Sequence, residues 1–281
     1  MRKQEVAAII LNYNSSADCG KCIEFLEKQN YDLLSIIVID NASTIQGEQE
    51  RLQEICKDKK VRLVFNSVNN GFSAGNNVGL RLASEMKADW MLIINPDVEL
   101  RDTNYISYVI QQIAKWSKAV VVGTDVVLPN GKKQNPMNEL TELEECFSIF
   151  EPMLNKTRTK KNTASYETGY CNKIYGCCFF VKASFLEQIG FFDENVFMYC
   201  EEAILAKKVE QENFKELFIK EVTAYHEHYA EEKSGNSCKR LQQYFESRIY
   251  YINHYSNYSK FGKFIAVSQR KIERMLWKLF S

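Results

Sequence analysis

The first candidate for chemistry is the carboxylate of Asp97, which follows a short apolar run. Residues 90–94 read Trp-Met-Leu-Ile-Ile, an apolar stretch of strand length, and Asn95-Pro96 ends it because proline cannot donate a ladder hydrogen bond. Asp97 is therefore expected at the carboxyl end of a buried strand, where open α/β sheets bind their ligands. A carboxylate there can hold a divalent cation, although Asn-Pro-Asp is also an ordinary turn sequence.

A second pair of carboxylates, Glu201 and Glu202, follows the run Phe197-Met198-Tyr199-Cys200. Apolar neighbours desolvate a carboxylate and raise its pKa, which suits a general base. The same pair begins an expected helix over residues 201–209, where two acids also complement the helix dipole. The sequence pattern alone leaves both interpretations open.

Three glycines, Gly71, Gly75 and Gly79, lie before the strand that delivers Asp97. Glycine lets a backbone approach a ligand closely, and the apolar positions that follow predict a helix from about Ala74. Backbone amides at a helix start, together with a cation-binding carboxylate, suit a diphosphate. Neither G-x-G-x-x-G after the first strand nor G-x-x-x-x-G-K-[ST] occurs, which excludes the two common phosphate loops.

The elements that position these residues alternate between strand and helix. Apolar runs predict strands at residues 6–11, 35–39, 61–65, 90–94, 119–128 and 174–181, with helices from after Ser16 to about residue 28 and at 48–56, 104–116 and 183–189. This alternation predicts an α/β fold with a doubly wound, mostly parallel sheet. Three strands end in polar clusters, which parallel pairing would bring to one crevice: Asn12-Tyr13-Asn14, Asp40-Asn41 and Asn95-Pro96-Asp97.

The composition bounds the class of protein. With 36 basic and 36 acidic residues among 281, the chain has no net charge that would favour binding to nucleic acid. We expect one catalytic-sized domain with a tail, without a signal peptide or membrane span, in the cytoplasm. Nine cysteines at irregular spacing indicate a reduced compartment, and Cys19 and Cys22 are interpreted as ordinary helix residues rather than a redox or metal pair, because no second pair accompanies them.

Residues 132–165 have a looser pattern, with an acidic group around residues 139–145 and a basic, polar run at 156–164. A solvated surface insertion is the favoured interpretation. A lid over a ligand site is the functional alternative.

An ordered set of motifs gives the chain a family resemblance. It resembles the family 2 glycosyltransferases with the A-type nucleotide-sugar-binding fold (GT-A), most closely their rhamnosyltransferase-like branch. The motifs are Leu-Asn-Tyr-Asn at 11–14, Val-Ile-Asp-Asn-Ala-Ser at 38–43, Asn-Asn-Gly-Phe-Ser-Ala-Gly-Asn-Asn at 69–77, Asn-Pro-Asp at 95–97, Gly-Cys-Cys-Phe-Phe-Val at 176–181, Gly-Phe-Phe-Asp-Glu at 190–194, Phe-Met-Tyr-Cys-Glu-Glu at 197–202 and Tyr-His at 225–226.

The resemblance implies a role for each matching position. Asp97 would bind Mn²⁺ or Mg²⁺ against the donor diphosphate, His226 would help to bind that metal, and Glu202 would be the catalytic base. His228 is nearby but off the pattern. The implied donor and nucleotide contacts are Leu11, Asn12, Tyr13, Asp40, Asn41, Asn70, Gly71 and Asn76.

The implied function is an inverting transfer of a sugar from a nucleotide diphosphate donor to a hydroxyl of a cell-surface glycan or lipid-linked precursor. Rhamnose from a thymidine diphosphate donor is expected by resemblance. The chain departs from the family at Glu201-Glu202, where the family has Glu-Asp, and at Ile204, where it has a second Asp. These departures support an alternative, a catalytically inactive nucleotide-sugar-binding or scaffolding protein.

The chain divides at about residue 230 into a GT-A domain and a helical extension. Residues 1–128 would form the nucleotide-sugar half, residues 129–230 the acceptor half, and residues 231–281 the extension, with helices at 244–258 and 260–281. The last helix is basic and amphipathic with aromatics, as in helices that lie in a membrane interface. Packing on its own domain or on a second subunit, as in a homodimer, is the alternative.

Overall fold

The structure, a computed structural model, describes residues 2–138, 140–147, 166–227 and 237–280. Its elements in chain order are β1 (Val6–Asn12), α1 (Ser16–Glu27), β2 (Leu34–Asp40), α2 (Glu48–Cys56), β3 (Val61–Phe65), α3 (Phe72–Glu85), β4 (Trp90–Ile94), β5 (Val98–Glu99), α4 (Tyr105–Ile113), β6 (Ala119–Val127), α5 (Glu142–Cys146), β7 (Gly169–Cys171), β8 (Cys178–Lys182), α7 (Ala183–Gln188), α8 (Glu201–Gln211), β9 (Lys215–His226), α9 (Ser237–His254) and α10 (Lys260–Phe280).

One sheet organises the molecule, with strand order β3-β2-β1-β4-β8-β6-β9-β5 and β7 paired to β9. The strands β3, β2, β1 and β4 are parallel, as predicted from their alternation with helices. In the register, Asn12 lies opposite Asp40, and Ile10 lies opposite both Val38 and Ile94. The carboxyl ends of these strands therefore meet at one edge of the sheet.

The second half of the sheet is mixed rather than parallel. β8 runs antiparallel to both β4 and β6, while β6 and β9 are parallel. The strand predicted at 174–181 begins only at Cys178, because the backbone N–H groups of Ile174 and Gly176 donate to Glu216 and Glu202 instead of to a strand. The turn before β8 thus lies at the same edge as Asp97.

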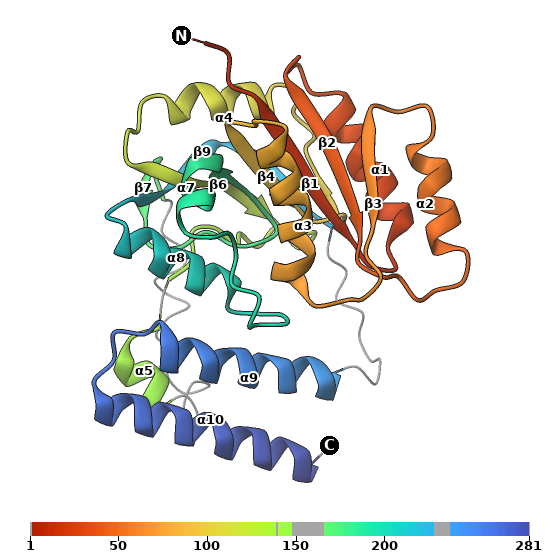
Figure 1. Cartoon of the computed structure of the whole chain (residues 1–281). Coiled ribbons are helices and arrows are strands. Elements are labelled where there is room, and N and C mark those ends of the chain that lie inside the picture. The colour runs from red at the N-terminus through yellow and green to blue at the C-terminus, as the bar shows by residue number, and fades with distance from the viewer. Residues whose placement is uncertain (1, 139, 148–165, 228–236, 281) are drawn as a thin grey trace.

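Helices cover both faces of the sheet (Figure 1). Apolar side chains of α1, α2 and α4 pack on one face, and those of α3, α7 and α8 pack on the other. The apolar strands are buried on both sides, which explains their continuous hydrophobic runs. Cys19 and Cys22 are buried free thiols within the first of these layers, consistent with their interpretation as ordinary helix residues.

The helices α9 and α10 form a separate layer below the sheet, with α10 outermost (Figure 1). α9 begins at Ser237, earlier than predicted, and α10 follows the predicted range closely. The layer contacts α8 through a small apolar cluster that includes Cys200, Ala203 and Ile204. No helix among the described residues is both long and apolar enough to cross a membrane.

The segment expected as an insertion or lid is described only in part. Its acidic portion forms α5, which begins with a capping box between Thr141 and Glu144 and packs against α10. The basic run at residues 156–164, together with His228, lies outside the described residues.

Candidate active site

Asp97 and His226 meet although they lie far apart in the sequence. The strand pair β5 and β9 sets the register, with Val98 opposite His226, and the Asp97 carbonyl accepts the Glu227 N–H over 2.8 Å. This places His226 Nε2 at 3.3 Å from Asp97 Oδ1. His226 is 4% exposed, whereas the Asp97 side chain is 25% exposed, so the pair opens toward solvent on the carboxylate side.

Gln134 fixes the orientation of the His226 ring. The Gln134 Oε1 atom lies 2.9 Å from His226 Nδ1, and because a carbonyl oxygen only accepts, Nδ1 carries the proton. Nε2 is then the ring nitrogen that faces the Asp97 carboxylate. Sequence reasoning missed Gln134, because the contact joins residues 92 positions apart.

An imidazole nitrogen beside a carboxylate oxygen is a donor pair that suits Mn²⁺. Among the described ranges, no group of three or more His, Cys, Asp and Glu side chains could hold a metal ion. The residues present therefore fit a cation that takes its remaining ligands from a diphosphate and water.

Glu202 lies on the other side of the same turn. Its Oε1 atom accepts the Gly176 N–H over 3.1 Å, and the carbonyl of the next residue, Cys177, accepts the Asn95 N–H over 2.8 Å. A Cβ atom at position 176 would lie 2.6 Å from Glu202 Oε1, so any other residue there would displace this carboxylate from its present position. One short turn thus joins Glu202 to the segment that carries Asp97.

Tyr175 completes this group of residues and was also not predicted. Its ring centroid lies 6.1 Å from that of His226. Burial raises the pKa of Tyr175 to about 12, and the nearby Cys177, Glu202 and Asp97 add to the shift. Tyr175 is therefore a neutral hydroxyl beside both carboxylates.

The start of α8 is held in an unusual backbone conformation. Tyr199 and Cys200 have φ angles of 74° and 67°, a region that side chains with a Cβ rarely adopt. Ser247 of α9 donates a hydrogen bond to the Met198 carbonyl over 2.7 Å, which helps to hold the turn. Such local strain concentrates at functional sites.

The glycine-rich segment connects the two halves of the site. Asn41 Nδ2 donates to Asn69 Oδ1 at 3.0 Å and to the Gly71 carbonyl at 3.2 Å. On the other side, the Phe72 N–H donates to the Phe197 carbonyl over 2.8 Å. Gly71 has a φ of 95°, and a Cβ atom there would overlap the Phe197 backbone. The helix α3 begins at Phe72, two residues earlier than predicted.

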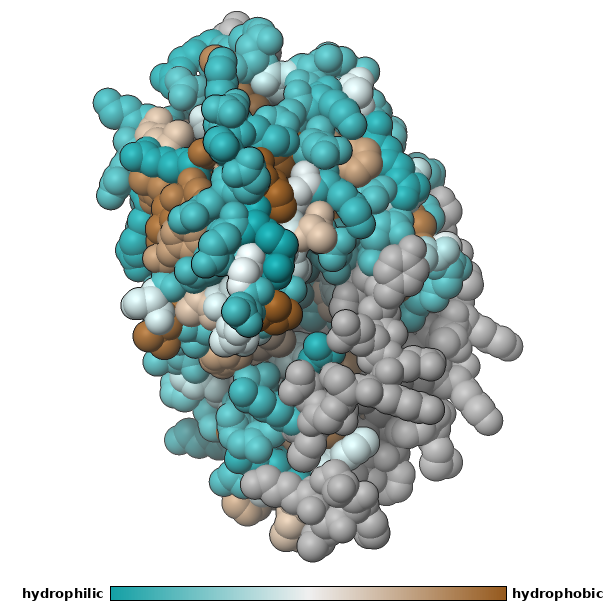
Figure 2. Space-filling model, turned by 90° about the vertical axis from the view of Figure 1, so that its right-hand side faces the viewer, coloured by the Kyte–Doolittle hydropathy of each residue, from teal (hydrophilic) through white to brown (hydrophobic). Residues whose placement is uncertain are grey.

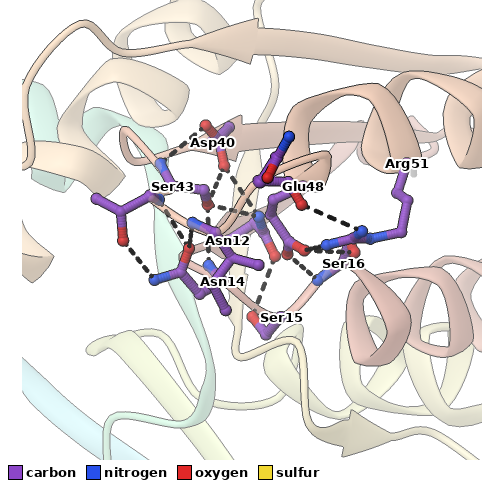
Figure 3. A network of polar contacts seen from close by, with 11 residues as sticks. Asn12, Asn14, Ser15, Ser16, Asp40, Ser43, Glu48 and Arg51 are labelled. Atoms are coloured by element: carbon purple, nitrogen blue, oxygen red, sulfur yellow. Dashed lines mark hydrogen bonds and ion pairs between the residues drawn. The ribbon is translucent and has the colours of Figure 1, made fainter.

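The polar ends of β1 and β2 bond to each other (Figure 3). Asp40 Oδ1 accepts from Asn12 Nδ2 at 2.9 Å and from Ser43 Oγ at 2.5 Å, and Gln49 donates to Oδ2 at 2.9 Å. Both Asn12 and Asp40 are fully buried. These two predicted nucleotide contacts therefore lie within the protein and shape the loops around them.

The other predicted donor contacts differ in exposure. Tyr13 is 45% exposed and Asn70 is exposed, so both side chains reach solvent at the strand ends. Leu11 is half-buried against Gly75, where a Cβ atom would lie 2.7 Å from Leu11 Cδ1. Asn76 is fully buried and donates to the Phe72 carbonyl.

Glu48 occupies the start of α1, which the sequence did not reveal. Its Oε1 atom accepts the Ser16 N–H at 2.5 Å, and its Oε2 atom accepts from Ser16 Oγ and Arg51 (Figure 3). Burial raises the pKa of Glu48, but the bonds from Arg51 and Ser16 outweigh it and lower the pKa. A protein carboxylate thus fills the position that a phosphate takes in common dinucleotide-binding folds.

The sequence of this chain matches the model of one known protein family. The model described as glycosyl transferase family 2 matches residues 7–190, more than half of the chain. The chain belongs to this family. The predicted family is therefore confirmed.

Two relatives of this family 2 member are named as sugar transferases. It is 25% identical to the low-salt glycan biosynthesis hexosyltransferase Agl10 of Haloferax volcanii, over 87% of this chain and 74% of the relative. It is 21% identical to the N-acetylglucosaminyl-diphospho-decaprenol L-rhamnosyltransferase of Mycobacterium tuberculosis, over 78% of this chain and 74% of the relative.

Solved structures support the A-type fold. The mannosyltransferase PcManGT from Pyrobaculum calidifontis, in complex with GDP-Man and Mn²⁺, matches with a TM-score of 0.62 and 16% identity. The match covers 98% of this chain and 71% of that one. The GT-A fold expected from the sequence is confirmed.

The departure of this family 2 chain at Ile204 has a structural reason. Ile204 is 2% exposed and packs in a cluster with Tyr251, Ile252 and Ala266 of the C-terminal layer. An aspartate at this position would bury a charge against apolar side chains. An apolar residue at position 204 is therefore explained by the packing of α9 and α10 against α8.

Proposed function

We propose that this chain is an inverting, metal-dependent glycosyltransferase that moves one sugar from a nucleoside diphosphate donor to a hydroxyl of a glycan or lipid-linked precursor. The observation that carries the proposal is the convergence of the Asp97–His226 pair and Glu202 on the turn at Gly176 and Cys177. On one side of the turn a metal ligand pair would serve the leaving diphosphate, and on the other side a base would serve the attacking hydroxyl.

The proposed metal ligands are Asp97 Oδ1 and His226 Nε2, with Mn²⁺ or Mg²⁺ as the ion. The ion would neutralise the charge that develops on the leaving nucleoside diphosphate. Tyr175, neutral and beside both carboxylates, is proposed to donate a hydrogen bond to a donor oxygen. The Mn²⁺ in the PcManGT complex supports the choice of ion.

Glu202 is proposed as the base. The acceptor oxygen attacks the anomeric carbon and forms the new glycosidic bond, while the bond from that carbon to the diphosphate oxygen breaks. The acceptor proton passes to Glu202, and the nucleoside diphosphate leaves with the bonding electrons. A single displacement with one base inverts the anomeric configuration.

The donor side is proposed to lie over the ends of β1 and β2 and the start of α3. Tyr13 and Asn70, whose side chains reach solvent, are proposed as direct contacts. The buried Asn12 and Asp40 are proposed to act by holding the loop in shape. A thymidine diphosphate donor of rhamnose is the proposed substrate, supported by the rhamnosyltransferase among the relatives.

The proposed acceptor class also bears on location. A lipid-linked acceptor, such as the one in the name of the mycobacterial relative, lies at a membrane surface. We therefore place this protein on the cytoplasmic side, in peripheral contact with the inner face of the cell membrane. The alternative, an inactive nucleotide-sugar-binding protein, is favoured by the Glu201-Glu202 pair in place of Glu-Asp and by Ile204 in place of the second Asp.

Calorimetry with a panel of nucleotide sugars tests the donor and metal parts. UDP-, GDP- and thymidine diphosphate sugars would each be titrated with Mn²⁺, with Mg²⁺ and with a chelator. One donor should bind in the presence of metal, and Asp97→Ala should lose that metal-dependent affinity. Asp18→Ala, which removes the acid of an exposed ion pair, is the control. A donor affinity that is the same with and without metal, and the same in Asp97→Ala, would overturn this part of the proposal.

A further inference from the structure

The outermost helix, α10, turns its large apolar side chains away from the protein. Phe261 is 74% exposed, Phe264 is 70% exposed and Met275 is 56% exposed. Their spacing, with Ile272 between them, places them on one face of the helix. The opposite face carries Gly262, Ala266 and Arg270, all buried. A helix that serves only its own protein buries its apolar face, so this face is built for another contact.

The short helix α5, which packs against α10, also exposes large apolar side chains. Leu143 is 71% exposed and Phe147 is 51% exposed. α5 is attached to the start of α10, because Ser259 Oγ donates to Glu142 at 2.6 Å and Cys146 Sγ to the Gly262 carbonyl at 3.4 Å. We call these exposed residues the outer apolar surface: Leu143, Phe147, Phe261, Phe264, Ile272, Met275, Leu276 and Trp277.

The outer apolar surface concentrates the exposed apolar groups of the molecule. Eight of the sixteen large apolar or aromatic side chains that are exposed in the described residues belong to it. Single exposed apolar residues need no explanation, but a gathering of this kind marks a binding surface. In Figure 2, tan residues are seen at the lower end of the molecule, where Figure 1 shows α10.

A buried charge network holds this surface in place. Glu145 of α5 is fully buried and accepts from Arg248 Nε of α9 at 3.0 Å and from Arg270 Nε of α10 at 2.8 Å. Three helices are thereby joined at one carboxylate. The outer apolar surface is therefore part of a fixed helical layer.

The charges beside the surface indicate which partner it fits. Residues 260–281 contain six basic residues and one acid, Glu273, and two of the six, Arg270 and Arg274, pair with Glu145 and Glu246. Lys260 and Lys271 are exposed beside the apolar stripe, while Glu273 pairs with Arg270. A second copy of this chain would bring the same basic side chains to the contact, with no added acidic partner in residues 260–281 besides Glu273. Anionic lipid headgroups attract the same charges.

We propose that the outer apolar surface docks on an anionic phospholipid bilayer, with α10 lying in the plane of the interface. Phe261, Phe264, Ile272 and Met275 enter the boundary between headgroups and acyl chains, and Lys260 and Lys271 lie at the level of the phosphates. The inference adds to the proposed function, since a bilayer carries lipid-linked acceptors. It is tested separately because vesicle binding requires neither donor nor turnover.

Sedimentation of the full chain with vesicles tests the docking. The chain should bind vesicles of phosphatidylcholine and phosphatidylglycerol more tightly than vesicles of phosphatidylcholine alone, and salt should weaken the binding. Phe261→Ser with Phe264→Ser should reduce binding about tenfold or more, given the area that two phenylalanines bury. Lys260→Glu with Lys271→Glu should remove the preference for the anionic lipid.

Two controls keep the outcome interpretable. Ile45→Ser removes an exposed apolar side chain on the loop after β2 and should leave vesicle binding unchanged. Thermal melting should show that the double phenylalanine variant is as stable as the wild type, because both rings are exposed. Absence of vesicle binding by the wild type overturns the proposal. So does a wild-type dimer that the phenylalanine variant converts to monomers without any effect on vesicles.

Discussion

The Nδ1 atom of His226 donates a hydrogen bond to Gln134 Oε1 over 2.9 Å, while the opposite ring nitrogen faces Asp97 at 3.3 Å. The amide thus occupies Nδ1 and leaves Nε2 as the ring nitrogen that faces the carboxylate. In metal sites, a partner behind the ligand fixes the tautomer and the ring orientation. Gln134 is therefore a positioning residue for the proposed metal site.

Replacement of Gln134 should weaken metal binding without touching a ligand. Gln134→Leu removes the acceptor, and Mn²⁺ affinity measured by electron paramagnetic resonance should fall about 10- to 100-fold. Gln134→Glu keeps an acceptor behind Nδ1 and should retain the affinity. Nitrogen-15 NMR of the His226 ring should report a protonated Nδ1 in the wild type. Equal Mn²⁺ affinity in the wild type and Gln134→Leu would contradict the positioning role.

Replacement of Gly176 should displace the proposed base. In Gly176→Ala the new Cβ would lie 2.6 Å from Glu202 Oε1, so the carboxylate must shift. Because misplacement by about 1 Å can cost about 100-fold, kcat should fall by that order while donor affinity is retained. The control is Gly169→Ala, whose Cβ would have only the Glu167 carbonyl near it, at 4.0 Å. An unchanged kcat in Gly176→Ala would argue against Glu202.

The pH dependence of stability should carry a signature of Glu201. Burial raises the pKa of Glu201 from 4.5 to about 8, and the charge of Glu202 adds to the shift. Between these two values the folded protein binds more protons than the unfolded chain, so stability falls as pH rises through this window. Glu201→Gln removes this titration. The Tm of the variant, relative to wild type, should therefore rise across the window, and a constant difference would refute the assignment.

The network at Glu145 should be a major contribution to stability. Burial raises the pKa of Glu145, but hydrogen bonds and charge from Arg248 and Arg270 outweigh it and hold the pKa below the usual value of 4.5. The stabilisation is therefore present above that value and lost as pH falls through the lowered pKa. Glu145→Gln removes the carboxylate that pairs with the buried Arg248 and one of the two that pair with Arg270, and should cost about 3–5 kcal/mol in urea unfolding.

A surface ion pair provides the control for Glu145. Glu246 pairs with Arg274 at 2.7 Å with both side chains partly exposed. Glu246→Gln should cost less than about 1 kcal/mol because water screens the pair. Similar losses in the two variants would show that burial of Glu145 does not set its contribution.

The parallel half of the fold was predictable from the sequence because local patterns determine it. The strand at residues 61–65, the strand at 90–94 and the helix at 48–56 agree with β3, β4 and α2. The 12-residue strand β9 was not identified by its pattern, because Lys215, Lys220 and Glu221 interrupt its apolar positions. The antiparallel insertion of β8 was not predictable either, since strand direction depends on pairing with distant segments.

A site residue was predictable only where the local sequence alone indicated both its position and its chemistry. The position of Asp97 at a strand end followed from the sequence. Gln134, Tyr175 and the link from Glu48 to Ser16 did not, because each acts through a partner that is distant in the sequence. The predicted contacts of Asn12 and Asp40 with the nucleotide stay predictions, and the structure adds that the two side chains bond to each other.

Turnover by Glu202→Gln tests the central claim most directly. With the donor that binds, the release of nucleoside diphosphate would be followed in the wild type, in Glu202→Gln and in Glu210→Gln, an exposed acid on the same helix. The account predicts that Glu202→Gln binds donor normally and turns over about 10²- to 10⁴-fold more slowly, while Glu210→Gln is unaffected. Turnover at the wild-type rate in Glu202→Gln would contradict it.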